Sequence, residues 1–116
     1  MAEKTIFSRI IDGEIPGQFV YQDDHLVAIR DINPAAPVHV LVIPRKPIPS
    51  LNELEEEDRE LIGRLMMAVP MIARQMGVAE TGYRVVVNTG AHGAQTVPHL
   101  HIHILGGKQM TGHGVA

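Results

Sequence analysis

The stretch that decides the fold is Gly93–Gly107, which reads Gly-Ala-Gln-Thr-Val-Pro-His-Leu-His-Ile-His-Ile-Leu-Gly-Gly. Within it, three histidines alternate with three aliphatic residues: His99, Leu100, His101, Ile102, His103 and Ile104. Alternation with a period of two predicts a β-strand, because residues i, i+2 and i+4 of a strand share one face. We therefore expect the imidazoles on one face of a sheet and the aliphatic side chains on the other face, packed into a core.

A row of imidazoles has three interpretations. An exposed face without a role is the first, but such faces usually carry Lys, Glu or Thr. A metal site is the second, but His99 and His103 would stand roughly 13 Å apart on an extended strand, so a zinc ion with nitrogen ligands at about 2.0–2.1 Å would need other ligands. Catalysis is the third, since imidazole titrates near neutral pH and attacks phosphorus or acyl centres. We favour catalysis, because neighbouring imidazoles can fix each other's tautomer, and we expect no metal.

Length and composition limit the class of protein. The 116 residues are the size of one domain, so we expect residues 1–116 to form a single domain. The chain has no cysteine, which excludes disulfides and thiol catalysis and is typical of a reducing compartment. The formal net charge is −3 without a basic stripe, which argues against a nucleic acid polymer as partner. The sequence has no long apolar run and no leader pattern, so we expect a cytoplasmic protein that does not bind membranes.

The rest of the chain predicts one short helix and four more strands. Residues 5–11 carry apolar side chains at helical spacing behind a capping threonine and predict a short N-terminal helix. Apolar runs bounded by turn residues predict strands at 19–23, 25–31, 38–44 and 82–88. The third of these strands carries a lone histidine, His39, which on this pattern is as typical of a core as of a functional site.

A long helix is predicted after the strand that carries His39. Ser50-Leu51-Asn52-Glu53 has the Ser-x-x-Glu pattern of a capping box, and residues 55–58 are acidic, as is favoured in the first turns of a helix. One apolar stripe follows at helical spacing: Leu61, Ile62, Leu65, Val69, Ile72 and Met76. Gly77 is a typical C-terminal stop. The predicted fold class is α+β, with an antiparallel sheet of about five strands, one long helix on one face and a short N-terminal helix.

The pattern His99-x-His101-x-His103 followed by apolar residues resembles the signature of the histidine triad (HIT) superfamily, and further segments resemble its nucleotide-binding (HINT) branch. These segments stand in order along the chain: Thr5-Ile6-Phe7, Glu14-Ile15-Pro16, Asp31-Ile32-Asn33-Pro34, Ala36-Pro37-Val38-His39, Leu41-Val42-Ile43-Pro44, Gly82-Tyr83-Arg84, Asn88 and Gly106-Gly107-Lys108-Gln109-Met110. The resemblance extends from about Lys4 to Met110. It implies a HIT-like fold that pairs into a homodimer, with the two sheets joined across the subunit contact.

The resemblance also implies an activity. Members of that branch hydrolyse the P–N bond of purine nucleoside 5′-phosphoramidates through a nucleotidylated histidine and release AMP or GMP and an amine. Nothing in this chemistry requires a metal, and we expect no cofactor. A purine nucleotide is therefore the expected partner. Three other functions stay open: dinucleoside polyphosphate hydrolysis, which a sister branch performs with the same triad; nucleotide binding or protein interaction without catalysis; and zinc binding.

The site residues implied by the resemblance are carried over by position. His101 matches the nucleophile, and His103 matches the residue that contacts the phosphate. His99 and His39 match positions that orient the nucleophile by hydrogen bonding. Asp31 matches the carboxylate that binds the ribose hydroxyls, although it is also a candidate cap of the turn that it begins. The resemblance further implies an apolar purine slot at Ile6, Phe7, Ile10, Ile29 and Ile32, and phosphate-side contacts at Asn88, Ala94, Gln95 and Thr96.

Overall fold

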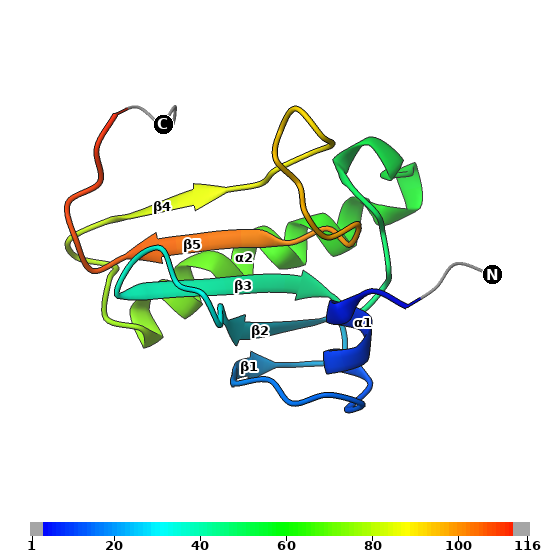
Figure 1. Ribbon diagram of the computed structural model, residues 1–116, viewed down its shortest axis with the longest axis horizontal. Coiled ribbons are helices and arrows are strands. Elements are labelled where there is room, and N and C mark those ends of the chain that lie inside the picture. The colour runs from blue at the N-terminus through cyan, green and yellow to red at the C-terminus, as the bar shows by residue number, and fades with distance from the viewer. Residues whose placement is uncertain (1–3, 113–116) are drawn as a thin grey trace.

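Five antiparallel strands form one sheet in the order β1-β2-β3-β5-β4 (Figure 1). The structure is a computed structural model that describes residues 4–112. The strands are β1 Phe19–Gln22, β2 Leu26–Arg30, β3 Val38–Pro44, β4 Tyr83–Val86 and β5 Ile102–Gly106. The helices within these residues are α1 Ile6–Ile11 and α2 Arg59–Gln75, with the 3₁₀ turns η1 Leu51–Glu53 and η2 Glu56–Asp58. The α+β fold predicted from the sequence, with five strands, one long helix and a short N-terminal helix, is confirmed.

The sheet separates two layers of different size. The larger apolar core lies under α2 and includes residues of the helix and the aliphatic side chains of the histidine stretch: Leu65, Val69, Ile72, Leu100, Ile102 and Ile104. The opposite face carries α1 over a smaller core: Phe7, Ile10, Val27, Ile29, Leu41 and Ile43. Figure 1 shows α2 behind the sheet and α1 in front of it, at one end of the strands. The aliphatic residues that alternate with the histidines therefore pack into the core, as predicted.

The short helix α1 begins at the predicted threonine cap. Thr5 Oγ1 accepts a hydrogen bond from the backbone N–H of Ser8 at 3.1 Å, and a cap of this kind contributes about 1 kcal/mol to stability. A helix of six residues is not stable alone, so its place depends on the side chains that it buries, Phe7 and Ile10. Neither α1 nor α2, the two α-helices of residues 4–112, is long and apolar enough to cross a membrane.

The start of the long helix differs from the prediction. Ser50 accepts a hydrogen bond from the backbone of Asn52, but the turn that it caps is η1 and not α2. The chain then adopts an extended backbone at Leu54 and Glu55, with ψ of 136° and 166°, which ends that turn. A second capping box, between Glu55 and Asp58, precedes α2. Two capping signals stand in series, and residue type alone does not tell which of them begins the long helix.

The histidine strand is shorter than predicted. β5 begins too late to include the first two histidines, and only His103 lies in the ladder, between β3 and β4. The reason is that the preceding backbone bonds elsewhere. The N–H of His99 donates to the carbonyl of Val97 at 2.8 Å, and the N–H of Leu100 donates to the carbonyl of Ile48 at 2.7 Å. These two bonds hold the residues before β5 outside the sheet ladder.

Candidate active site

Four histidines gather on the face of the sheet that carries α1. Three come from the single stretch His99, His101 and His103, and the fourth, His39, comes from the neighbouring strand β3. The ring centroids of His101 and His103 are 4.9 Å apart, and those of His39 and His103 are 5.2 Å apart. The ring of Phe7 in α1 meets the His101 ring edge-on, with centroids 4.8 Å apart. Residues from three separate parts of the chain thus form one cluster.

The position of the proton on His101 follows from its neighbour. His101 Nδ1 lies 2.7 Å from the carbonyl oxygen of His99, and a carbonyl can only accept a hydrogen bond. The proton of the neutral ring therefore lies on Nδ1, and Nε2 carries a free lone pair. Burial lowers the pKa of His101 from its usual 6.5, so the ring is neutral at pH 7. A neutral imidazole with an unprotonated Nε2 is the form that a nucleophile needs.

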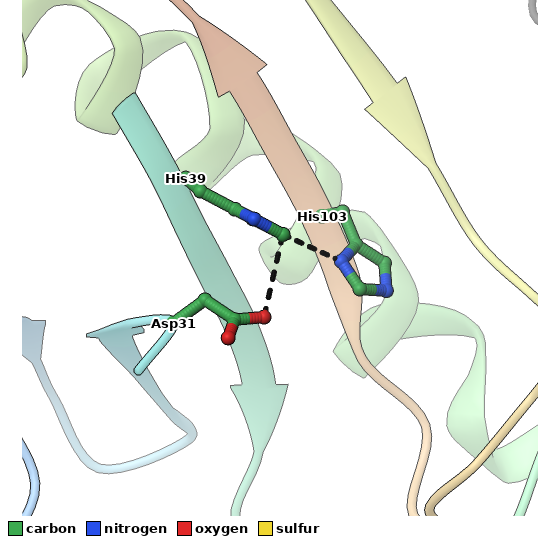
Figure 2. Close-up of side chains that lie close together, drawn as sticks. All are labelled: Asp31, His39 and His103. Atoms are coloured by element: carbon green, nitrogen blue, oxygen red, sulfur yellow. Dashed lines mark hydrogen bonds and ion pairs between the residues drawn. The ribbon is translucent and has the colours of Figure 1, made fainter. Parts of the chain in front are cut away.

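The proton on His103 is fixed by a chain of hydrogen bonds through His39 (Figure 2). The backbone N–H of Ala35 donates to His39 Nδ1 at 3.0 Å, so the proton of His39 lies on Nε2. His39 Nε2 donates to His103 Nδ1 at 2.9 Å, so His103 carries its own proton on Nε2. Asn88 Nδ2 lies 3.5 Å from that nitrogen, and because an amide nitrogen cannot accept a hydrogen bond, this tautomer requires the amide oxygen of Asn88 to face His103 instead. Burial, and then the charges that His101 and His39 would carry, lower the pKa of His103 to about 4. At neutral pH His103 is therefore a neutral hydrogen-bond donor.

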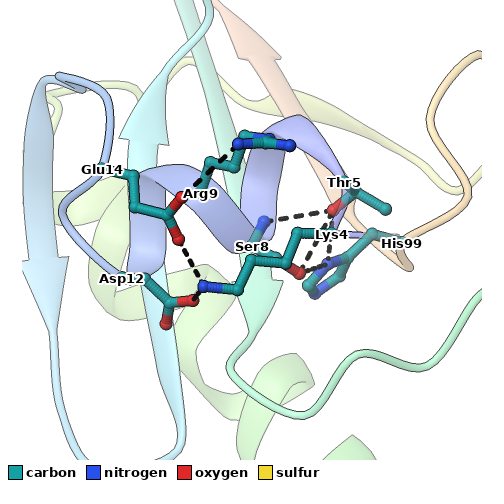
Figure 3. A network of polar contacts seen from close by, with 7 residues as sticks. All are labelled: Lys4, Thr5, Ser8, Arg9, Asp12, Glu14 and His99. Atoms are coloured by element: carbon teal, nitrogen blue, oxygen red, sulfur yellow. Dashed lines mark hydrogen bonds and ion pairs between the residues drawn. The ribbon is translucent and has the colours of Figure 1, made fainter. Parts of the chain in front are cut away.

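The ring of His99 makes a contact that the sequence did not indicate (Figure 3). It is fully buried, its Nε2–H donates to the carbonyl of Pro44 at 2.9 Å, and its Nδ1 accepts from the hydroxyl of Thr5 at 3.1 Å. His99 reaches the expected nucleophile through its backbone carbonyl instead of its ring. His39, for which the same orienting role was expected, bonds to His103 instead. The first difference arises because the orienting atom is a backbone carbonyl, which residue type does not reveal. The second arises because the pairing of β3 with β5 brings the rings of His39 and His103 within hydrogen-bond distance.

The two oxygens of Asp31 have different surroundings. Oδ1 accepts a hydrogen bond from the backbone N–H of Asn33 at 2.8 Å and so caps the turn that follows. Oδ2 lies 3.5 Å from His39 Nε2. The turn cap considered from the sequence is therefore present, and it uses only one oxygen. The other oxygen remains on the side of the histidines, where a ribose contact is expected.

Asp31, His39 and His103 also form a cluster with the spacing of a metal site. Their ligand atoms all lie within 4.8 Å of one another. A metal would need a lone pair on His39 Nε2, and the neutral ring would then carry its proton on Nδ1. That nitrogen faces the N–H of Ala35, which cannot accept a hydrogen bond. The tautomer favoured by the backbone therefore opposes metal binding through His39.

A cleft of about 250 Å³ lies beside the histidines. Its polar lining includes Asp31, Thr96, His101 and His103. Its apolar lining contains all five residues expected to form a purine slot, together with two others: Ile6, Phe7, Ile10, Ile29, Ile32, Leu41 and Val97. Of the two that the sequence analysis missed, Leu41 was detectable, because it lies two residues beyond His39 on the same strand face. Val97 carried no such signal.

The loop expected to contact a phosphate is held by its own side chains. The side chain of Gln95 donates to the carbonyl of Pro49 at 2.7 Å and accepts from the N–H of Gly90 at 3.0 Å. Ala94 has a φ of 60°, a left-handed conformation that a residue with a Cβ rarely adopts. Thr96 is the residue of this loop that lines the cleft with its neighbour Val97. Gln95 thus braces the loop, and Thr96 faces the space where a ligand would lie.

Known proteins resemble this chain over nearly its whole length. A family model described as the HIT domain matches residues 12–110. The chain is 50% identical over 110 residues to a purine nucleoside phosphoramidase of Escherichia coli K12, covering 95% of this chain and 92% of that protein. A solved HIT family hydrolase from Clostridium thermocellum has a TM-score of 0.94 at 41% identity, covering 99% of this chain and 100% of that one. A HIT family hydrolase from Legionella pneumophila has a TM-score of 0.90 at 42% identity, covering 93% and 96%. The chain therefore belongs to the HIT domain family.

Proposed function

We propose that this protein is a purine nucleoside phosphoramidase, which hydrolyses the P–N bond of a purine nucleoside 5′-phosphoramidate and releases AMP or GMP and an amine. The observation that carries the proposal is the lone pair on His101 Nε2, on a buried ring that lines a partly apolar cleft. A relative with 50% identity is named for this activity. The lining of the cleft agrees with this activity, because its apolar side chains can contact a purine base and its histidines can contact a phosphate.

In the first step, His101 Nε2 attacks the α-phosphorus. An Nε2–P bond forms and the P–N bond breaks, with its electron pair moving to the leaving nitrogen, which takes a proton from water. Because Nδ1 keeps its proton, the nucleotidylated ring is cationic, and the carbonyl of His99 at 2.7 Å stabilises it. A cationic imidazole is also a good leaving group for the next step.

In the second step, water attacks the same phosphorus. The Nε2–P bond breaks, the electron pair returns to His101, and the proton lost by the attacking water goes to solvent. The sum of the two steps consumes one water and regenerates the neutral ring. Two displacements through a covalent intermediate replace one more difficult displacement.

His103 acts in this scheme as a hydrogen-bond donor to a phosphate oxygen. Its Nε2–H is available because His39 occupies its Nδ1 at 2.9 Å. A second proton on Nδ1 would face the N–H of His39, which disfavours the imidazolium, as does the lowered pKa of about 4. The neutral ring of His103 therefore stabilises the negative charge of the transition state by donating a hydrogen bond from Nε2. It does not protonate the leaving nitrogen, which takes its proton from water.

The nucleoside occupies the rest of the cleft in this proposal. The ribose hydroxyls bind Asp31 Oδ2, the oxygen that the turn does not use. The purine lies between the side chains of α1 and Ile32, whose side chain is 84% exposed in the free protein. Covering this exposed isoleucine with a base removes apolar surface from water, at about 25 cal/mol per Å².

We also propose that two copies pair into a homodimer through β4. Among the strands of residues 4–112, β4 pairs only with β5, so it forms an edge of the sheet. Val85 on this strand is exposed, as are Met66 and Met67 on α2. Open edge strands are the places where two sheets join. Sedimentation equilibrium should give a dimer that Val85→Lys weakens, and a monomeric wild type at micromolar concentration would contradict the assignment.

The mechanism is tested by trapping the intermediate. The protein is mixed with adenosine 5′-phosphoramidate and quenched in denaturant without acid, because phosphorus–imidazole bonds hydrolyse in acid. Peptide mapping should then locate the added mass of an AMP group on His101. An adduct on any other residue would overturn the assignment of the nucleophile.

Two further assays separate the proposal from its alternatives. Turnover of adenosine 5′-phosphoramidate is compared with turnover of diadenosine triphosphate, and we expect the phosphoramidate to be preferred. Exhaustive chelation should leave the rate unchanged. A preference for the dinucleotide, or loss of activity on chelation that zinc restores, would favour the sister hydrolase or a zinc-dependent reaction instead.

A further inference from the structure

The N-terminal segment is tied to the rest of the chain by polar contacts at one point (Figure 3). Within the described residues, the hydrogen bonds from residues 4–15 to the chain beyond them end on His99 Nδ1, which lies 3.1 Å from Thr5 Oγ1 and 3.4 Å from Ser8 Oγ. The ion pairs of Lys4 stay inside the segment. The place of α1 against the sheet therefore depends on apolar packing with β2 and β3 and on a single imidazole nitrogen.

The hydrogen bond between Thr5 and His99 has a defined direction. His99 Nε2–H donates to the carbonyl of Pro44, so His99 Nδ1 carries a lone pair. Thr5 Oγ1 accepts from the backbone N–H of Ser8 at 3.1 Å. Its hydroxyl hydrogen has two acceptors within reach, His99 Nδ1 at 3.1 Å and Ser8 Oγ at 3.3 Å, and the imidazole nitrogen is the nearer. Thr5 thus serves both as the cap of α1 and as the donor to a buried histidine. The sequence pattern accounts only for the first of these roles.

His99 connects this contact to the nucleophile. Its ring receives the hydroxyl of Thr5, while its backbone carbonyl holds His101 Nδ1–H at 2.7 Å. The helix that Thr5 caps brings Phe7 edge-on to His101 and places Ile6 in the lining of the cleft. His99 therefore contacts both the helix that lines the cleft, through its ring, and the His101 ring, through its backbone carbonyl.

We propose that Thr5 is a positioning residue. Its hydroxyl, bonded to His99 Nδ1, holds α1 at the spacing from His101 at which one nucleotide fills the cleft and presents its phosphorus to Nε2. Nucleotide binding in the cleft rests on the proposed function, but the hydrogen bond between the Thr5 hydroxyl and the His99 imidazole does not. Loss of the hydroxyl changes nucleotide affinity and rate together, because the wall moves relative to the nucleophile.

The test compares Thr5→Val, which keeps the shape and removes the hydroxyl, with Thr5→Ser, which restores it. AMP affinity is measured by calorimetry, and kcat and KM are measured on adenosine 5′-phosphoramidate well below the unfolding temperature. For Thr5→Val we expect AMP affinity to fall about tenfold, the factor that corresponds to one lost hydrogen bond of about 1.4 kcal/mol, with a lower kcat. Thr5→Ser should stay within about twofold of the wild type.

Asp23→Ala is the matched control for stability. Asp23 Oδ1 caps the backbone N–H groups of His25 and Leu26 in the turn between β1 and β2, outside the lining of the cleft. This variant should lose thermal stability as Thr5→Val does and keep its AMP affinity. If Thr5→Val also keeps its AMP affinity and kcat, or if Thr5→Ser fails to restore them, Thr5 is only a helix cap and the proposal is overturned.

A ligand-free measurement separates this proposal from the proposed function. The ¹⁵N resonances of the imidazole rings report which ring nitrogen is protonated and how it is bonded. Thr5→Val should shift the resonances of His99 and His101 and leave those of His39 unchanged. If the wild type shows no phosphoramidase activity but these shifts occur, the proposed function fails and the positioning role stands. Unchanged His99 and His101 resonances refute the positioning role whatever the activity.

Discussion

The two faces of the sheet use burial differently. In the core between α2 and the sheet, side chains such as Leu65, Ile72 and Ile104 are fully buried among other apolar side chains. Under α1, apolar side chains share the buried space with His39, His99 and His101. Burial on the α2 face contributes stability through removal of apolar surface from water. Burial on the α1 face also changes the proton affinity of imidazoles, and so prepares groups for chemistry.

The α1 face shows how a small domain accommodates buried polar groups. On the α1 face, each histidine is paired with a backbone group or with another histidine, and each pairing sets a tautomer. A buried polar group without a partner costs about 1–3 kcal/mol, so these pairings are also needed for folding. Substitutions on the α2 face should therefore change mainly stability, whereas substitutions on the α1 face should also change activity.

Removal of the proposed nucleophile should have the largest effect on activity and little effect on the α2 face. For His101→Ala we expect kcat/KM to fall by at least about 10⁴-fold, in the range seen when a nucleophile is deleted, with AMP still bound. Steady-state kinetics and calorimetry measure the two quantities. His25→Ala, which removes an exposed histidine, is the control and should be unchanged. Equal losses in the two variants would remove His101 from the mechanism.

Truncation of a buried side chain of α2 should instead lower stability and leave activity unchanged. Ile72 is fully buried, and Ile72→Ala should lower the free energy of unfolding by about 2–5 kcal/mol, measured in urea. The folded fraction should keep the wild-type kcat, because the helix lies on the far face from the histidines. Ile10→Ala, on the α1 face, should reduce both stability and nucleotide affinity. A selective loss of kcat in Ile72→Ala would contradict the separation of the two faces.

Acid should affect the α1 face first. Because the pKa values of His99, His101 and His103 are lowered in the folded state, the unfolded chain takes up protons near pH 6.5 while the folded chain does not. Stability should thus be full above pH 6.5 and decline as the pH falls toward about 4. Because burial lowers the pKa of His101, its ring stays neutral below pH 6.5. We therefore expect kcat/KM to be maintained in mildly acidic solution and to fall at lower pH.

Urea titrations and rate measurements across this pH range test the prediction. His103→Asn should reduce the pH dependence of stability, because it removes the histidine with the pKa of about 4. Greater stability at pH 5 than at pH 7 would contradict the assignment of these histidines as neutral.

The smallest effect is expected in the loop beside the histidines. Ala94 has a φ of 60°, so Ala94→Gly should relieve about 1 kcal/mol of backbone strain and raise the unfolding temperature. Gly93→Ala, one residue earlier, should destabilise instead, because a Cβ there would lie 2.4 Å from the carbonyl oxygen of Thr89. Thermal unfolding of both variants measures the pair of effects, and the same sign in both would show that the loop relaxes freely.

Local patterns were sufficient for most of the fold. Apolar runs between turn residues predicted four of the strands, and period-two alternation predicted the face of each side chain in the histidine stretch, because both signals depend on neighbouring residues alone. The boundaries were less accurate. β5 starts late because Leu100 donates to Ile48, about fifty residues away, and α2 starts late because two capping signals compete. Such long-range and competing bonds leave no trace in a short window of sequence.

Residue types and their spacing were sufficient to predict the α+β class, the gathering of the aliphatic residues on one face, and the row of histidines that marks the candidate site. Which ring nitrogen of each histidine carries the proton follows only from the folded chain. The carbonyl of His99 leaves a lone pair on His101 Nε2, and the N–H of Ala35 sets the tautomers of His39 and His103. The physical reason is that side-chain identity and period are local properties, whereas a tautomer depends on backbone groups that only the folded chain brings within hydrogen-bond distance.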